Sequence, residues 1–145
     1  MPTYYIMDLA DDMPAAVAKE MPSAAEIAAC KWLPDKELAV YADEYGRNGF
    51  QGGLNWYRSR TSGAFESELQ LFAGRTIDVP SIFISGKSDW GVQQRPGAFE
   101  KMQQAACTRM VGAHLLDGAG HWVQQEQSEA VSRLLVDFLR QQSSV

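Results

Sequence analysis

The first part of the chain has the hydrophobic pattern of helices. Four apolar residues recur at i, i+3, i+4 and i+7 along one segment: Leu38, Tyr41, Ala42 and Tyr45. This spacing predicts a helix over about residues 35–47, which Gly49 ends. Further upstream, Ser23 and Glu26 have the spacing of a capping box, which predicts that another helix begins there.

The pattern is weaker between residues 50 and 76. Residues 50–58 read Phe-Gln-Gly-Gly-Leu-Asn-Trp-Tyr-Arg, an aromatic stretch with two glycines near its start. The pattern assigns no regular element to this stretch. Residues 59–76 are polar and irregular, apart from a short helix predicted over about residues 68–72.

The C-terminal part has a different pattern. Apolar runs at 82–84, ending near Gly86, and at 110–116 predict two buried parallel strands. A helix is predicted between them over residues 97–104. The last helix begins at Ser128 and has five apolar residues on one face: Val131, Leu134, Leu135, Phe138 and Leu139. This order predicts an α/β fold in which a parallel sheet is covered by helices on both faces.

The chain thus divides into a helical segment, 1–76, and a βαβα segment, 77–145. The second segment contains only two convincing strands. Two parallel strands make no self-sufficient sheet, because their open edges leave unpaired N–H and C=O groups. Further strands are therefore expected from a part of the protein beyond this sequence or from a partner.

Composition excludes several classes of partner. The 145 residues are 46% hydrophobic and carry a formal net charge of −5, which argues against nucleic acid and anionic membranes. No apolar run is long enough for a transmembrane helix, and residues 1–8 lack the features of a signal peptide. Cys30 and Cys107 lack any Cys-x-x-Cys spacing and are predicted to be free thiols, which fits a cytoplasmic protein.

Two residues with catalytic chemistry follow the two predicted strands. Asp89 comes after the first strand and His121 after the second. Because ligands bind outside the carboxyl ends of parallel strands, both side chains are expected at the same rim. An aspartate that accepts from a histidine Nδ1–H leaves Nε2 free as a general base. Alone, Asp89 would be read as a loop cap and His121 as an ordinary loop residue; their order and placement favour a catalytic pair.

Residues 79–139 resemble the last two strands of the α/β-hydrolase fold. The segment 120–126, Gly-His-Trp-Val-Gln-Gln-Glu, resembles epoxide hydrolases and related dehalogenases, and residues 50–58 resemble the cap segment of epoxide hydrolases. The resemblance implies that Asp89 is the triad acid and His121 the triad histidine. It also implies that Tyr57 donates a hydrogen bond to the oxygen of a small epoxide, and a phenol can do so at neutral pH. Trp90 and Trp122 flank the pair and are weaker candidates for walls of an apolar substrate pocket.

The nucleophile of that family is missing from the sequence. No Gly-x-Asp-x-Gly or Gly-x-Ser-x-Gly elbow occurs, and the nearest segment, 86–90, lacks the closing glycine. Ser81 stands where a phosphate-binding loop that ends at residues 86–88 needs glycine. His114 lies inside a predicted strand, where a core role is favoured, so no zinc cluster and no other cofactor is predicted.

Three functional readings follow. The favoured one is an epoxide hydrolase-like protein whose sequence here lacks the nucleophile and is inactive alone, with a complementing N-terminal half as a possible partner. The second is a non-catalytic remnant that self-associates as a homo-oligomer or binds a relative. The third is a dehalogenase-type hydrolase, which would not depend on Tyr57.

Overall fold

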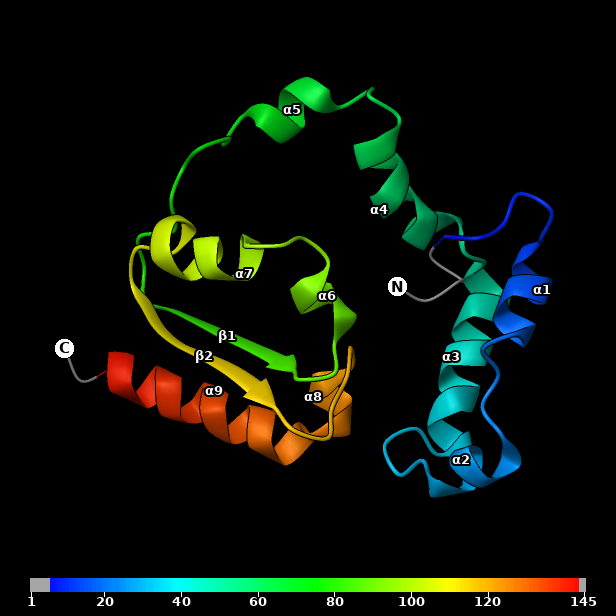
Figure 1. Ribbon diagram of the computed structural model, residues 1–145. Coiled ribbons are helices and arrows are strands. Elements are labelled where there is room, and N and C mark those ends of the chain that lie inside the picture. The colour runs from blue at the N-terminus through cyan, green and yellow to red at the C-terminus, as the bar shows by residue number, and fades with distance from the viewer. Residues whose placement is uncertain (1–5, 144–145) are drawn as a thin grey trace.

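The computed structural model describes residues 6–143. Residues 1–5, which belong to the segment 1–8 that lacks signal-peptide features, lie outside the described range. The chain starts with helices and adds strands only in its second half (Figure 1). The helices of the first half are α1 (Met13–Ala18), α2 (Ala24–Ala29), α3 (Asp35–Asn48), α4 (Gln51–Thr61) and α5 (Glu66–Gln70). None of the helices in the described residues is long and apolar enough to cross a membrane.

Local capping explains where α2 and α3 begin and end. The Ser23 side chain accepts from the backbone N–H of Glu26, and the Glu26 carboxylate accepts from the backbone N–H of Ser23 at 2.8 Å. This confirms the predicted capping box. Helix α3 ends at Gly49, whose φ of 66° is in the left-handed region that favours glycine. The predicted helix over 35–47 is therefore confirmed.

The aromatic stretch 50–58, to which the sequence pattern gave no element, is helical. It forms most of α4, although Gly52 and Gly53 lower the helix propensity of its first turn. Helix α5 begins at Glu66, two residues before the predicted 68–72 segment. Together α1 to α5 form an arc outside the sheet layer, which returns to the start of the first strand (Figure 1). Most apolar side chains of this arc are exposed to solvent, and Ala16 is its one buried residue in the described range.

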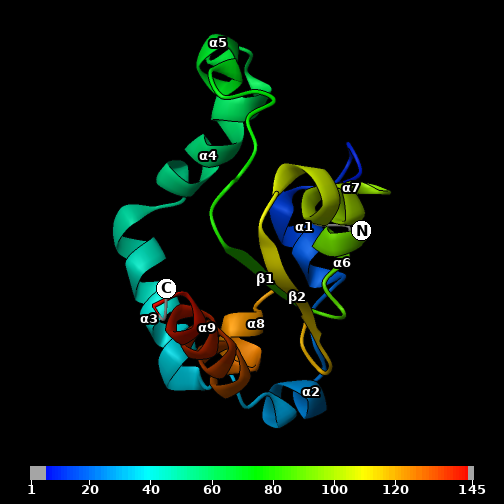
Figure 2. The ribbon, with the colours of Figure 1, turned by 90° about the vertical axis from the view of Figure 1, so that its left-hand side faces the viewer.

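The second half forms the predicted layered α/β unit. Strands β1 (Ser81–Gly86) and β2 (Met110–Leu116) pair in parallel, with Ile84 opposite His114. The connecting and covering helices are α6 (Trp90–Gln93), α7 (Ala98–Lys101), a π-helical turn over Met102–Ala106, α8 (Val123–Glu126) and α9 (Ser128–Gln142). Helices α6 and α7 lie on one side of the sheet and α9 on the other (Figures 1 and 2).

Alternating side chains of β1 face the two helical layers. Phe83 packs edge-on against Phe99 of α7, with ring centroids 5.4 Å apart. Ile84 packs on the opposite face against a small core of Ala119, Val123 and Val131. His114 lines a hollow on the same face beside α9, away from the rim; it is only partly buried and does not belong to this core.

The core of this unit is small for its apolar content. Its buried hydrophobic residues in the described range are few: Ala119, Val123, Val131 and Cys107. The sheet has two strands in the described residues, so each strand pairs along one edge only. Cys30 and Cys107 are both free thiols, as predicted.

Candidate functional site

The end of β1 positions Asp89. The strand ends at Gly86, and Asp89 caps the N-terminus of α6 by accepting from the backbone N–H of Gly91 at 2.8 Å. The buried Ser85 hydroxyl donates to the other carboxylate oxygen of Asp89 at 3.2 Å. Only 12% of the Asp89 side chain is exposed. Two contacts other than the one with His121 therefore hold the carboxylate in place.

The end of β2 brings His121 to the same rim. The strand ends at Leu116, and Gly118, with φ of 72°, turns the chain back toward the sheet. The Nδ1 atom of His121 then lies 3.2 Å from Oδ1 of Asp89. Figure 1 shows both strands pointing toward the turns that carry these residues. The structure therefore brings together the acid and the histidine that the strand order predicted.

A close backbone contact joins the two loops. The backbone N–H of Ser88 donates to the carbonyl of Ala119 at 3.0 Å, and that of Lys87 donates to the carbonyl of Leu116 at 2.8 Å. Gly86 lies under this contact, where a Cβ atom would meet the Gly120 carbonyl oxygen at 2.2 Å. Only glycine fits such an approach, so Gly86 sets the spacing between the Asp89 and His121 loops.

The surroundings of Asp89 favour its ionised form. Burial raises the pKa of Asp89, but the N–H of Gly91, the ring of His121 and the hydroxyl of Ser85 act in the opposite direction. Together these contacts hold the pKa of Asp89 below its ordinary value of 3.8. Asp89 is thus a carboxylate at neutral pH.

An ionised Asp89 fixes the proton on the His121 ring. A carboxylate only accepts hydrogen bonds, so Nδ1 of neutral His121 must carry the proton of the shared bond. The lone pair of the ring then lies on Nε2, and 51% of the His121 side chain is exposed to solvent. This arrangement can take a proton from water, which is the chemistry of a general base oriented by an acid.

Both tryptophans contact His121. The Trp90 ring lies nearly parallel to the imidazole, with centroids 6.2 Å apart, and the Trp122 ring meets it edge-on at 5.4 Å. The two weaker pocket candidates are thus adjacent to the ring. Trp122 also lines an apolar cavity of about 160 Å³ between α3 and α8, together with Trp32, Leu33, Leu38, Tyr41 and Gln125.

One charged residue at the site escaped the sequence reasoning. Glu126, at the end of α8, accepts from the backbone N–H of Gly120 at 2.7 Å and from that of Trp122 at 2.9 Å. These two N–H groups lie on either side of His121 in the chain. No sequence signal pointed to this contact, because Glu126 is the last residue of a four-residue helix and accepts from N–H groups of the loop that precedes it.

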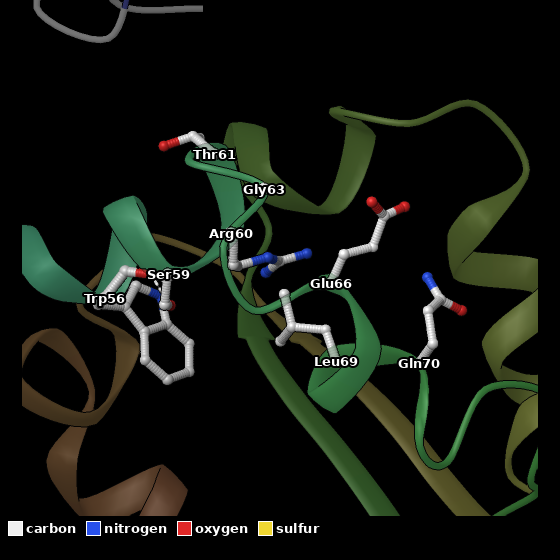
Figure 3. A pocket seen from close by; sticks show the side chains of 8 residues that line it. All are labelled: Trp56, Ser59, Arg60, Thr61, Gly63, Glu66, Leu69 and Gln70. Atoms are coloured by element: carbon white, nitrogen blue, oxygen red, sulfur yellow. Dashed lines mark hydrogen bonds between the residues drawn. The ribbon is translucent and has the colours of Figure 1, made fainter.

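Tyr57 is not brought to the pair. It lies on α4, with 52% of its surface exposed, and both ribbon views show α4 standing away from the α6 and α8 turns (Figures 1 and 2). An open hollow of about 600 Å³ also lies on this arm, between α4 and α5 (Figure 3). Its polar lining includes Arg60 and Glu66, and neither Asp89 nor His121 borders it. This hollow and the candidate catalytic residues therefore lie in different parts of the molecule. Asp89 and His121 lie in the turns that follow the two strands.

A hydrogen bond connects the helical arm to the histidine region. The Gln125 side chain of α8 donates to the Tyr41 hydroxyl of α3, across the small apolar cavity. Among the described residues, no cluster of three or more His, Cys, Asp or Glu side chains has the arrangement of a metal site.

Comparison with curated proteins gives relatives of one kind. Epoxide hydrolase A of Mycobacterium tuberculosis is 41% identical over 111 residues, covering 74% of this chain and 32% of the relative. An epoxide hydrolase of Caballeronia sordidicola is 41% identical over 112 residues, covering 75% of this chain and 32% of the relative. The chain thus spans about a third of the length of these relatives. No family model matches the sequence.

Solved structures with the same fold include two epoxide hydrolases. Potato epoxide hydrolase I superposes with a TM-score of 0.72 at 27% identity, covering 93% of this chain and 41% of that protein. An epoxide hydrolase from an endophytic Streptomyces superposes with a TM-score of 0.73 at 34% identity, covering 79% of this chain and 34% of that protein. The two-stranded unit is accordingly a partial α/β-hydrolase fold.

Proposed function

We propose, from the premise that this chain belongs among the epoxide hydrolase-like α/β-hydrolases, that Asp89 and His121 are its acid–base pair for opening epoxides to vicinal diols. The observation that supports this most directly is the 3.2 Å contact between His121 Nδ1 and Asp89 Oδ1 at the ends of adjacent parallel strands. The lowered pKa of Asp89 supports the same role, because a triad acid must stay ionised while the histidine takes up a proton.

In the proposed reaction a carboxylate nucleophile opens the epoxide and forms an alkyl ester, and the epoxide oxygen leaves as an alkoxide that takes a proton. His121 Nε2 then removes a proton from water, and the resulting hydroxide attacks the ester carbonyl. The acyl C–O bond of the ester breaks and the imidazolium proton passes to the departing diol oxygen. The carboxyl group of the nucleophile then releases a proton, which balances the one taken up by the alkoxide, and the carboxylate is restored. Asp89 stabilises the imidazolium formed in between, without taking its proton.

The nucleophile in this scheme comes from outside the printed sequence. The sequence has no Gly-x-Asp-x-Gly or Gly-x-Ser-x-Gly elbow, and Asp89 already holds the position of the acid. We therefore propose that this polypeptide alone does not turn over epoxides. It provides the base and the acid, and a segment with the elbow provides the attacking carboxylate.

The partner proposed for this role is a complementing N-terminal half of a related hydrolase. Each of the two strands pairs along one edge only, and a parallel sheet normally has neighbouring strands and a cover on both faces. The arm exposes large apolar side chains that such a partner would cover, among them Leu54, Trp56 and Tyr57. Docking of this kind would also fold α4 over the rim, where Tyr57 could donate to the epoxide oxygen.

The first test is hydrolysis of styrene oxide by the purified chain, beside His121→Ala. We expect no turnover in either. Turnover that His121→Ala abolishes would mean that a carboxylate of this chain attacks, or that His121 activates water directly, and the proposed need for a second segment would be wrong.

The second test restores the missing chemistry. This chain replaces the matching segment of Mycobacterium tuberculosis epoxide hydrolase A, and the chimera is assayed beside His121→Ala and the control His114→Gln. Activity that depends on His121 and survives the change at His114 is expected. A soluble, folded chimera with no activity would contradict the proposed function and favour a non-catalytic remnant.

A further inference from the structure

We infer that Glu126 is a positioning residue for His121. Its two carboxylate oxygens accept one backbone N–H from each side of the histidine, Gly120 at 2.7 Å and Trp122 at 2.9 Å. A bidentate acceptor of this kind fixes the path of a three-residue loop, because moving the middle residue would lengthen one of the two bonds. Bonds from N–H groups to a carboxylate are also among the stronger hydrogen bonds of proteins.

The loop needs such a support because its other polar contacts are few, although the rings of Trp90 and Trp122 lie against the imidazole. The His121 ring is half-exposed, and its polar contact in the described residues is the single bond to Asp89. Gly120 has no side chain to pack, and Trp122 is half-exposed. Ala119, by contrast, is buried in the core and fixes only the start of the loop. Glu126 therefore determines whether Nδ1 stays within reach of Asp89.

This inference rests on the proposed function, since positioning matters chemically only where His121 acts as the base. It is tested without turnover, by NMR of the full chain. The sequence contains only two histidines, His114 and His121, so the ring nitrogen signals of each are assigned with one substitution. The variants are Glu126→Gln, whose amide can accept only one of the two N–H groups, and Glu126→Ala, which accepts neither. The matched control is Glu129→Gln, an exposed glutamate in the first turn of α9.

Two results are expected. In Glu126→Ala, the amides of Gly120 and Trp122 both exchange about tenfold faster or more. In Glu126→Gln only one of these two amides exchanges faster, and in Glu129→Gln neither rate changes. The fraction of His121 with its proton on Nδ1 falls in the same order, while the ring signals of His114 stay constant. A purely structural role would move the exchange rates and leave the His121 tautomer unchanged, and that outcome would overturn the inference.

A measurement on the unsubstituted chain covers the case in which the variants fail to fold. The Gly120 and Trp122 amides should exchange more slowly than the exposed loop amides of Gly63 and Gly74, and equal rates would overturn the inference. The result is also separable from the proposed function. A chimera without epoxide turnover would contradict the function, whereas the tautomer shift reports on Glu126 alone.

Discussion

The two regions of this molecule contain similar numbers of apolar residues but differ in how many of those side chains they bury. The arm of α1 to α5 leaves nearly all its apolar side chains in solvent, while the βαβα unit buries a small core and aligns two loops at its rim. The two regions also differ in which contacts fix the positions of their candidate site residues. The Asp89 and His121 loops are set by backbone hydrogen bonds and short-range caps within the unit. The position of Tyr57 instead depends on what α4 packs against. The contact between Asp89 and His121 is thus formed by the two strands that carry them, whereas the position proposed for Tyr57 needs a surface for α4 to pack against.

The largest expected effect concerns the pair itself. In the chimera, Asp89→Asn should lower kcat on the order of 10³-fold or more, because an amide in that position favours the wrong tautomer of His121. His121→Ala should stop ester hydrolysis and trap the alkyl-enzyme, which mass spectrometry of the intact protein detects as an added epoxide mass. The control is Asp137→Asn, a surface change on α9. Near-normal turnover in either site variant would contradict the catalytic role proposed for Asp89 and His121.

The next effect tests whether the two loops are joined at Gly86. A Cβ atom there would press on backbone of residues 119 and 120, so Gly86→Ala should lower the free energy of unfolding by about 1–3 kcal/mol. Chemical denaturation measures this, and the NMR signals of His121 should shift at the same time. If the variant is as stable as the parent chain, the close backbone contact does not set the spacing of the site.

A substitution in the arm should act in the opposite direction. Gly53 lies in α4 with open space around a Cβ atom, so Gly53→Ala should stabilise that helix by about 0.5–1 kcal/mol. Amide exchange along α4 measures the change, and exchange in β1 and β2 should not respond. If amide exchange in β1 and β2 also slows, the arm and the βαβα unit unfold together and are not independent in stability.

The smallest effect is on the pH dependence of stability. The pKa of Asp89 is lower in the folded chain than its ordinary value of 3.8, so its contacts stabilise the fold above that pH. This contribution is lost as the pH falls through the lowered pKa. The difference in unfolding free energy between the parent chain and Asp89→Asn should therefore be larger at neutral pH than at strongly acidic pH. A difference that does not vary with pH would mean that Asp89 gains nothing from ionisation in the fold.

The strand ends were the most predictable part of the molecule. The apolar runs around residues 82–84 and 110–116 are short, and the positions of Asp89 and His121 follow from the parallel order that these strands require. Helix α3 was equally predictable, because its apolar period and its terminal glycine agree.

Other features were beyond the sequence pattern for physical reasons. Helix α4 was missed because the two glycines at its start oppose helix formation, and α6 and α8 have only four residues each, which is too short for a period. The contact from Glu126 depends on how tightly the loop turns after β2, which no spacing reveals. The motif around Tyr57 identifies a family without fixing where α4 packs.

The backbone hydrogen bonds between the Asp89 and His121 loops have a consequence for which substitutions these loops tolerate. The groups that meet there are main-chain N–H and C=O, which every residue except proline provides, so the side chains of Lys87 and Ser88 are free to vary. The size of Gly86 and the burial of Ala119 are not free in this way. In a library of random single replacements scored for folding, tolerance should therefore be high at Lys87 and Ser88 and low at Gly86 and Ala119. Where the two loops meet, the two small residues are thus more constrained than the two larger polar ones.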